Sequence, residues 1–283
     1  MKALIRPLYN RLTAGETIAS FDATVQNLRN QSIYPIADYI KEYAVNDTDI
    51  EQSVKEYKTL ANVAGLDYIA LKPSSFRFQA APFHSLVQHL VAHKKKVLID
   101  AEDVANQDAI HKLTDDCLEN YNKDAVWVYK TYQMYRRDSL ARLASDLQRF
   151  PFIGVKLVRG AYMKQDKGTG MLYTQKADTD AAFRKAVQLS LGGGGVGGSG
   201  LIHTMVCTHN ALDIRYLIEH QKNNRAAFVH ASLYGFIPKD TQLLVNASIP
   251  TYKYLPYGPM EAAIPYLMRR VQENPYVLRY YFS

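Results

Sequence analysis

The chain has 283 residues, of which 47% are hydrophobic, and it carries a formal net charge of +7. This length fits a single α/β barrel as well as two smaller domains, and the hydrophobic fraction can fill a sizeable core. The longest apolar runs fall short of the roughly 20 residues of a membrane-spanning helix, which excludes an integral membrane protein, and the dispersed basic residues argue against nucleic acid as a partner.

Eight short apolar runs predict β-strands. They cover residues 32–40, 66–72, 96–100, 125–132, 152–158, 201–207, 226–232 and 249–255. Their nearly continuous hydrophobicity is typical of parallel strands that are covered on both faces.

Amphipathic segments with helical periodicity separate these runs. They cover residues 49–65, 84–93, 106–121, 139–150, 178–191, 210–221 and 239–247, with an extra helix at 17–30 before the first strand and one within 257–274 after the last. Eight strand–helix units predict a (β/α)8 TIM-type barrel that forms a single catalytic domain over residues 1–283, with the last helix over its mouth. An open doubly wound sheet is the alternative, but the glycine-rich turn that usually follows its first strand is absent.

The glycine-rich run GGGGVGGSG covers residues 192–200. Its composition predicts a flexible linker or loop inside the barrel. It lacks the Lys-Ser/Thr ending of a phosphate-binding loop and precedes a strand rather than a helix, so we assign it no chemistry.

Polar side chains stand near the end of almost every predicted strand, where the active sites of such barrels lie. Each has an ordinary structural explanation, such as a solvated lysine or a helix cap, but a purely structural barrel does not need all of them. The set is Lys72, Asp100, Glu102, Lys130, Lys156, Arg159, Thr208, His209, Asn210, His230 and Tyr254. The positive balance predicts an anionic ligand with carboxylate or phosphate groups. No spacing favours a metal site.

The predicted C-terminal helix carries a second polar group. Tyr266, Arg269, Arg270 and Glu273 are three or four residues apart, which places them along one side of a helix. If that side lies over the barrel mouth, the two guanidinium groups suit a carboxylate ligand.

Five segments resemble flavin-dependent proline dehydrogenase. They are IDAE (99–102), KLVRGAYM (156–163), YTQKADTD (173–180), CTHN (207–210) and YKYLPYGPMEAAIPYLMRRVQEN (252–274). The similarity runs in order from residue 13 to residue 274 and looks closer to the monofunctional mitochondrial branch. It implies a distorted (β/α)8 barrel that holds FAD over its strand ends, oxidises L-proline to Δ1-pyrroline-5-carboxylate and passes the electrons to a membrane quinone.

The resemblance also implies roles for individual residues. The substrate-binding positions are Lys72, Leu233, Tyr254, Tyr266, Arg269 and Arg270. The cofactor-binding positions are Lys130, Lys156, Val158, Gly160, Tyr162, Thr174, Lys176, Thr208, His209, Asn210 and Glu273. Lys156 and Asp100 are the catalytic candidates: Lys156 would stabilise the negative charge of the reduced flavin, and Asp100 would orient Lys72 or a tyrosine hydroxyl.

Two positions depart from the family pattern. Lys130 stands where the family usually has an amide at that strand end, and it could reach the flavin carbonyl oxygens. Ser232 stands before Leu233, where the family usually has glutamine. Both differences concern the flavin pocket rather than the substrate site.

Three alternative functions remain open at this point. A hydroxyproline dehydrogenase of the same family is the nearest, although the bulky phenol of Tyr254 would crowd a ring hydroxyl. An aldolase-type barrel that forms a Schiff base on Lys72 or Lys156 would leave the arginine pair without a task. The third alternative is a non-catalytic barrel that binds amino acids or flavin.

Compartment and partners follow from composition and resemblance. Two widely separated cysteines, Cys117 and Cys207, indicate a reducing compartment. The resemblance implies the matrix side of the mitochondrial inner membrane for a eukaryotic source, and otherwise the bacterial cytoplasm with peripheral contact to the membrane surface. No transit peptide is visible, and the sequence does not fix the oligomeric state.

Overall fold

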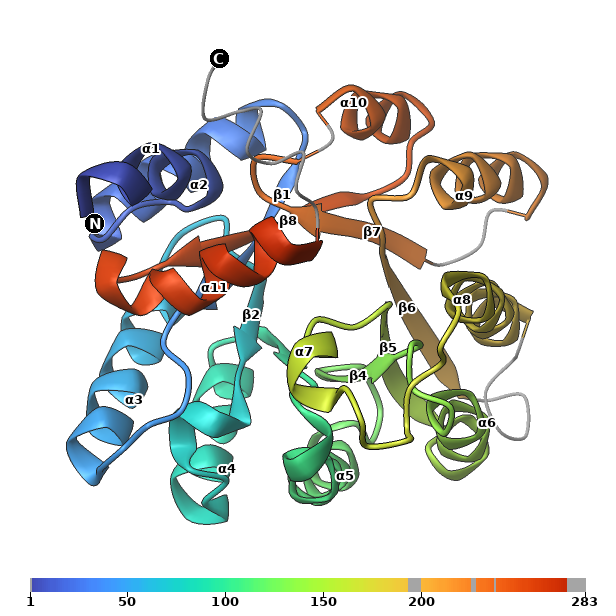
Figure 1. Ribbon diagram of the computed structural model, residues 1–283, viewed down its shortest axis with the longest axis horizontal. Helices are drawn as coiled ribbons and strands as arrows, with labels where there is room; N and C mark the ends of the chain where they lie inside the picture. Colours follow the sequence, from blue (N-terminus) through green and yellow to red (C-terminus); the bar gives the residue numbers. More distant parts are fainter. Residues whose placement is uncertain (1, 193–199, 225–227, 237, 274–283) are drawn as a thin grey trace.

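The computed structural model of the protein describes residues 2–192, 200–224, 228–236 and 238–273. Eight strands alternate with helices along the chain (Figure 1). The strands are β1 Tyr34–Tyr39, β2 Tyr68–Leu71, β3 Lys96–Ile99, β4 Val128–Gln133, β5 Phe152–Val158, β6 Leu201–Cys207, β7 Phe228–Leu233 and β8 Thr251–Tyr257. The α-helices are α1 Lys2–Leu12, α2 Ile18–Asn30, α3 Asp47–Ala61, α4 Ala80–Ala92, α5 Gln107–Tyr121, α6 Ser139–Arg149, α7 Met163–Asp166, α8 Lys176–Gly192, α9 Ala211–Asn224, α10 Pro238–Asn246 and α11 Met260–Glu273, with short 3-10 helices η1 Pro73–Phe76 and η2 Val104–Asn106.

The strands form a closed parallel barrel in sequence order. β8 pairs with β1 in a register that runs from Tyr34 opposite Tyr252 to Tyr39 opposite Tyr257, and this pairing closes the sheet. The (β/α)8 barrel predicted from the sequence is therefore confirmed. Because all strands are parallel, their C-terminal ends meet at one mouth, where chemistry is expected.

Two hydrophobic layers hold the barrel. A large cluster lies between the strands and the surrounding helices and includes Val97, Val155 and Leu157. A smaller cluster fills the barrel interior and includes Ile36, Tyr129, Met205 and Tyr254. Side chains alternate between these layers along each strand, so the register decides which residues face the mouth.

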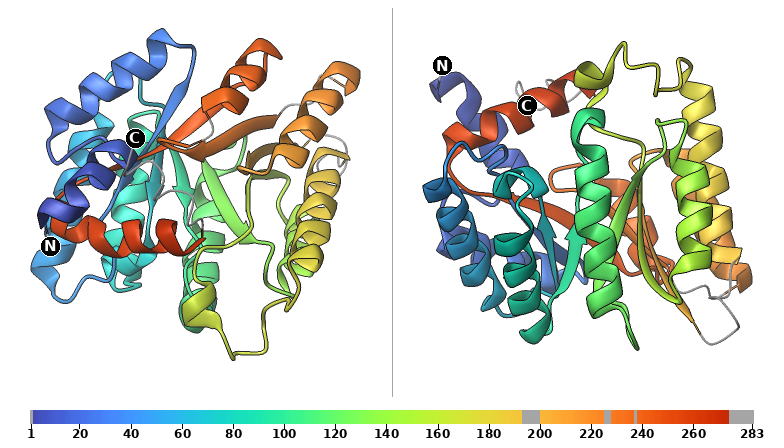
Figure 2. Two further views of the ribbon diagram at one scale, coloured as in Figure 1. Left: turned by 45° about the horizontal axis from the view of Figure 1, so that its top comes forward. Right: turned by 90° about the horizontal axis from the view of Figure 1, so that it is seen from below.

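A third cluster attaches α11 to the N-terminal part of the chain. It joins residues of α1, such as Leu8 and Leu12, to Tyr266 and Leu267 of α11. The hydroxyl of Tyr9 also donates a hydrogen bond to the carbonyl of Gly258, at 2.6 Å. Figure 2 shows α11 and α7 at the same end of the barrel. Helices at the positions of α2 and α11 are expected from the sequence, whereas α1 is not.

Two expectations extend beyond the described residues. Residues 193–199 of the predicted linker at 192–200 lie outside them, although Gly192 ends α8. The single-domain prediction for residues 1–283 stays a prediction for the same reason. Within the described ranges, no helix is both long and apolar enough to cross a membrane.

Candidate active site

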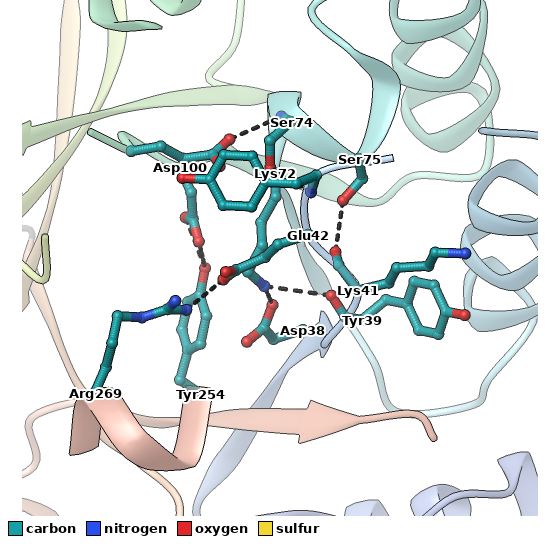
Figure 3. Close-up of polar contacts among 12 residues, drawn as sticks. Asp38, Tyr39, Lys41, Glu42, Lys72, Ser74, Ser75, Asp100, Tyr254 and Arg269 are labelled. Atoms are coloured by element: carbon teal, nitrogen blue, oxygen red, sulfur yellow. Dashed lines mark hydrogen bonds and ion pairs between the residues drawn. The ribbon is translucent and has the colours of Figure 1, made fainter. Parts of the chain in front are cut away.

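Three predicted residues meet at the mouth: Lys156 of β5, Asp100 at the end of β3 and Tyr254 of β8. Figure 3 shows Asp100 beside the Tyr254 hydroxyl. The Lys156 ammonium lies 2.6 Å from Oδ1 of Asp100 and donates to the Tyr254 hydroxyl at 3.1 Å. The Tyr254 hydroxyl lies 2.7 Å from each Asp100 carboxylate oxygen. Burial and the Asp100 carboxylate raise the pKa of Tyr254 well above its usual value, so the phenol stays protonated and acts as a donor.

Lys72 pairs with a residue that the sequence analysis did not select. Its ammonium contacts the carboxylate of Asp38 in β1 and donates to the carbonyl of Tyr39 at 3.3 Å. Burial opposes the charge on Lys72, but the carboxylates of Asp38, Glu42 and Asp100 together outweigh burial and raise the Lys72 pKa, so the lysine stays cationic. This charge is nearly inaccessible to water, since both side chains are at least nine-tenths buried.

Arg269 forms the third ion pair of the mouth. Its Nη2 donates to Oε1 of Glu42, in the loop after β1, at 2.5 Å, and its guanidinium lies 5.1 Å from the centre of the Tyr162 ring. Burial opposes the charge of Arg269, but Glu42 together with Tyr162 and Tyr43 outweighs burial and raises the pKa of Arg269 above its usual value. Among the described residues, Nε of Arg269 is buried without a hydrogen-bond partner, which leaves this guanidinium a free donor.

The other predicted substrate residues also lie on elements of this end. Tyr266 and Arg270 are buried on α11, and the Arg270 guanidinium lies 5.2 Å from the centre of the Tyr266 ring. Leu233 ends β7 and packs against both the barrel interior and the cluster beneath α11. The predicted substrate-binding residues therefore come from strand ends that are far apart in the sequence and from α11, which lies over those strand ends.

The expected contact of Lys130 with a flavin is wrong. Lys130 forms ion pairs with Asp115 of α5 and with Asp146 of α6, the latter at 2.7 Å, so its side chain points outward into the helix layer. The register explains this, because Lys130 is level with Val155, which belongs to the outer cluster. β4 continues to Gln133, so the strand does end in an amide, three residues beyond Lys130.

Gln133 is a site residue that the sequence analysis missed. Its Oε1 accepts a hydrogen bond from the backbone N–H of Ala161 at 3.3 Å, and its Nε2 donates to the carbonyl of Glu102 at 2.7 Å. Gly160, beside Ala161, has φ +134°, and a Cβ there would overlap the ring of Tyr135. The turn after β5, which begins at Val158 and reaches Tyr162, therefore requires glycine.

The end of β6 is joined to β7 through Thr208 and His209. The Thr208 hydroxyl donates to Asp213 and accepts from Arg159, both at 2.9 Å. Burial and nearby cations, Lys253 first, lower the pKa of His209 to about 3. This histidine is neutral, and its Nε2 accepts from the N–H of Leu233 at 3.0 Å, which puts its proton on Nδ1.

Asn210 caps the start of α9, since its Oδ1 accepts from the N–H of Leu212 at 2.9 Å. Thr174 and Lys176 are exposed before and at the start of α8, and Lys176 pairs with Asp180. The Glu273 side chain lies outside the described part of the chain, so its predicted role stays a prediction. His203 and His209 stand near opposite ends of β6, with His203 bonded to Tyr129, so they do not form a joint metal site.

The fold and this mouth define a barrel enzyme whose strand ends carry ion-paired cations. A sequence model of the proline dehydrogenase family matches residues 21–278, and the chain belongs to that family. The protein therefore belongs to the dehydrogenase class of enzymes.

Curated relatives differ in how much of their length this chain spans. The carbapenem antibiotics biosynthesis protein CarD of Pectobacterium carotovorum is 27% identical over 298 residues, which cover 92% of this chain and 77% of that protein. Proline dehydrogenase 1, mitochondrial, of Drosophila melanogaster is 32% identical over 225 residues (72% and 33%). Hydroxyproline dehydrogenase of Bos taurus is 32% identical over 217 residues (69% and 46%). The chain thus spans less than half the length of the last two.

Solved structures share the barrel at low sequence identity. Proline utilization A from Bdellovibrio bacteriovorus, inactivated by N-propargylglycine, has a TM-score of 0.80 at 17% identity and covers 94% of this chain and 32% of its own. Proline utilization A from Corynebacterium freiburgense has a TM-score of 0.78 at 16% identity, with 96% and 31% covered. These likenesses support the fold.

Proposed function

We propose that this protein oxidises L-proline to Δ1-pyrroline-5-carboxylate, with FAD as the first electron acceptor and a membrane quinone as the next. The observation that carries the proposal is the gathering of Lys72, Lys156 and Arg269 at one barrel mouth, beside the phenol of Tyr254. Figure 3 shows Lys72, Arg269 and Tyr254 of this group. L-Proline is a small zwitterion whose carboxylate needs a cationic fork and whose ring needs apolar walls. The family match supports the same reaction.

The substrate carboxylate would be held by α11. Arg269 offers a free Nε donor among the described residues, and Arg270 lies beside it on the same helix. Tyr254, Tyr266 and Leu233 provide aromatic and apolar surface for the ring. A bidentate guanidinium contact fixes direction as well as adding affinity, so it would set which ring carbon faces the cofactor.

The donor set of the mouth suits FAD. When bound, FAD accepts a hydride from the ring carbon next to the amine. Lys156 is the buried cation that would stabilise the charge delivered in that transfer. Gln133, the Gly160 turn and the start of α9 at Thr208 to Asn210 offer hydrogen-bonding groups and a helix N-terminus for the polar parts of the cofactor.

The position of Asp100 suits it to orient Tyr254 and Lys156 rather than to abstract a proton from the substrate. Both its oxygens accept from the Tyr254 hydroxyl, and Oδ1 is also bonded by Lys156. Because both oxygens already accept hydrogen bonds from these two groups, Asp100 would fix the phenol and the ammonium relative to each other. The substrate amine would lose its proton to solvent before it is oxidised.

The direct test is the product. Purified, flavin-loaded protein is incubated with L-proline and an artificial electron acceptor, and the products are identified by mass spectrometry. We expect a cyclic imine two mass units lighter than proline. Turnover of L-proline to any other product, or none with full flavin occupancy, would refute the proposal.

A second candidate is oxidation of hydroxyproline, because hydroxyproline dehydrogenases are among the relatives. We expect Tyr254→Ser to raise the kcat/KM ratio of trans-4-hydroxyproline to L-proline by at least tenfold, since it removes a buried phenol that would otherwise meet a ring hydroxyl. Loss of the bond to Asp100 should also lower proline oxidation. Parallel steady-state assays with both substrates measure this ratio, and an unchanged ratio would show that the phenol does not set specificity.

Membrane-surface contact is part of the proposal. Val45, Met163 and Met268 are 80%, 64% and 50% exposed. They lie in the loop after β1, on α7 and on α11, all segments of the mouth end. Apolar side chains on that side would bring the cofactor close to a quinone in the membrane. The names of two relatives favour the mitochondrion for a eukaryotic source, where this membrane would be the inner one.

A further inference from the structure

A chain of hydrogen bonds runs across five neighbouring strand ends at the mouth. The N–H of Tyr43, after β1, donates to the hydroxyl of Ser74, after β2, at 3.2 Å. The N–H of Ser74 donates to Oε1 of Glu102, after β3, at 2.8 Å. Gln133, at the end of β4, donates to the Glu102 carbonyl at 2.7 Å and accepts from Ala161, after β5, at 3.3 Å.

Glu102 occupies the middle of this chain. Its side chain is completely buried, with 0% exposure. One carboxyl oxygen accepts from Ser74, whereas Oε2 has no hydrogen-bond partner among the described residues. A buried carboxyl group with one oxygen left without a hydrogen bond lowers the stability of the fold. The presence of Glu102 at this position therefore needs an explanation other than stability.

The two ends of the chain carry groups of the proposed active site. On one side, Tyr43 follows Glu42, the partner of Arg269, and Ser74 is two residues from Lys72. On the other side, Ala161 follows Gly160 in the turn assigned to the cofactor. Glu102 is the link through which the substrate side and the cofactor side are held in a fixed relation.

We propose that Glu102 is a positioning residue for proline oxidation, which holds the loop of Lys72 in line with the β5 turn through Ser74 and Gln133. This inference rests on the proposed function. It does not require Glu102 to touch substrate or cofactor. A shift of about 1 Å between groups that act on one substrate is enough to lower the rate substantially.

The protonated form of Glu102 suits this role. Burial raises its pKa to about 7, with the nearby Glu42 acting in the same direction and Lys72 against it. Tyr43 and Tyr162 also face it, and burial raises the pKa of both phenols far above neutrality, so neither supplies charge. A neutral carboxyl still accepts from Ser74 and places no unpaired charge beside Glu42.

The test compares three variants with wild type. Glu102→Met keeps the volume but cannot accept from Ser74, Glu102→Gln keeps an acceptor and mimics the neutral acid, and Asp146→Asn alters another buried carboxylate in the outer layer. We expect Glu102→Met to raise the KM for L-proline about tenfold, and Glu102→Gln and Asp146→Asn to stay within twofold of wild type. If Glu102→Met does not fold, Glu102→Asp, which shortens the side chain, carries the same expectation.

Two results would overturn the inference. One is a wild-type KM in a folded Glu102→Met or Glu102→Asp variant whose unfolding midpoint has fallen, because this would reduce Glu102 to a structural residue. The other is a Glu102→Gln variant as impaired as Glu102→Met. Failure of the wild-type protein to oxidise L-proline would instead refute the proposed function. The same assays distinguish this outcome, because they include the wild-type protein.

A second readout needs no flavin. The folded-state pKa of Glu102 lies above the ordinary value of 4.5, so its ionisation opposes folding and stability is lost as pH rises through about 7. Glu102→Gln cannot ionise. We expect the unfolding midpoint of Glu102→Gln to rise relative to that of wild type as the pH increases from 5 to 8. A difference between the two midpoints that does not change with pH would contradict a neutral Glu102 in the folded protein.

Discussion

Arg269→Met is expected to raise the KM for L-proline by roughly 10- to 100-fold, while the flavin stays bound. Hydrogen bonds to charged groups are worth about 1.5–3 kcal/mol, and each 1.4 kcal/mol corresponds to about tenfold in affinity. Among the described residues, Nε of Arg269 is buried without a hydrogen-bond partner and can donate to a ligand. The fall in kcat should be smaller than the rise in KM, because Lys156 and Tyr254 are left in place.

Arg149→Met is the matched control for this prediction. Arg149 is also ion-paired, with Asp115 and Glu119, but it lies on α6 outside the barrel and its side chain is 49% exposed. We expect its KM to equal that of wild type. A KM unchanged in Arg269→Met as well, measured by initial rates over a wide proline range, would show that Arg269 is a structural partner of Glu42 and no more.

Lys156→Met is expected to lower the rate of hydride transfer by about 10²- to 10³-fold, the usual effect of removing one group that stabilises developing charge. Lys156 is 5% exposed, and its ammonium is bonded by Asp100 and Tyr254. These contacts fix its position before the reaction, so no reorganisation is needed as charge develops. Single-turnover reduction of the flavin, followed by stopped-flow absorbance at saturating proline, measures this rate.

Lys130→Met serves as the control for Lys156→Met. It removes a buried lysine from the neighbouring strand, but one that faces outward to Asp115 and Asp146. We expect it to lose stability, because it leaves the buried carboxylate of Asp146 without its cation, whereas Asp115 keeps its ion pair with Arg149. We expect it to keep the wild-type rate per bound flavin. Equal loss of rate in both variants would mean that Lys156 acts through the stability of the barrel.

The barrel could be predicted because each of its strands leaves a local signal. All eight apolar runs overlap the observed strands, and β5 and β6 coincide with the predicted ranges. The helix α1 was missed because its sequence is basic and contains Pro7, and its burial depends on contact with the distant α11. Such long-range packing is not visible in a local pattern.

Lys130 and Gln133 show what strand patterns leave open. A strand covered on both faces has no polar side to mark its orientation, so a lysine in it can point either way. Register places Lys130 with Val155 on the outer face, and three further residues bring Gln133 to the mouth. The apolar pattern predicts that the strand ends at residue 132, whereas β4 ends at Gln133.

The sequence patterns also did not identify Asp38 and Glu42, the acidic residues that pair with cations at the mouth. Asp38 is the one acid in a buried apolar strand, and a buried charge requires a partner. The sequence therefore indicates that Asp38 has a cationic partner, but it does not indicate that this partner is Lys72. Glu42 has no such signal, because it lies in a loop and meets Arg269 across 227 residues of chain.

The central claim is that L-proline reduces a flavin in this barrel. The most direct measurement is the visible absorbance of purified, FAD-loaded protein under anaerobic conditions, before and after L-proline is added. We predict that the flavin band bleaches with L-proline and much less with trans-4-hydroxyproline. A protein that takes up no FAD, or a bound flavin that L-proline leaves oxidised, would contradict the account.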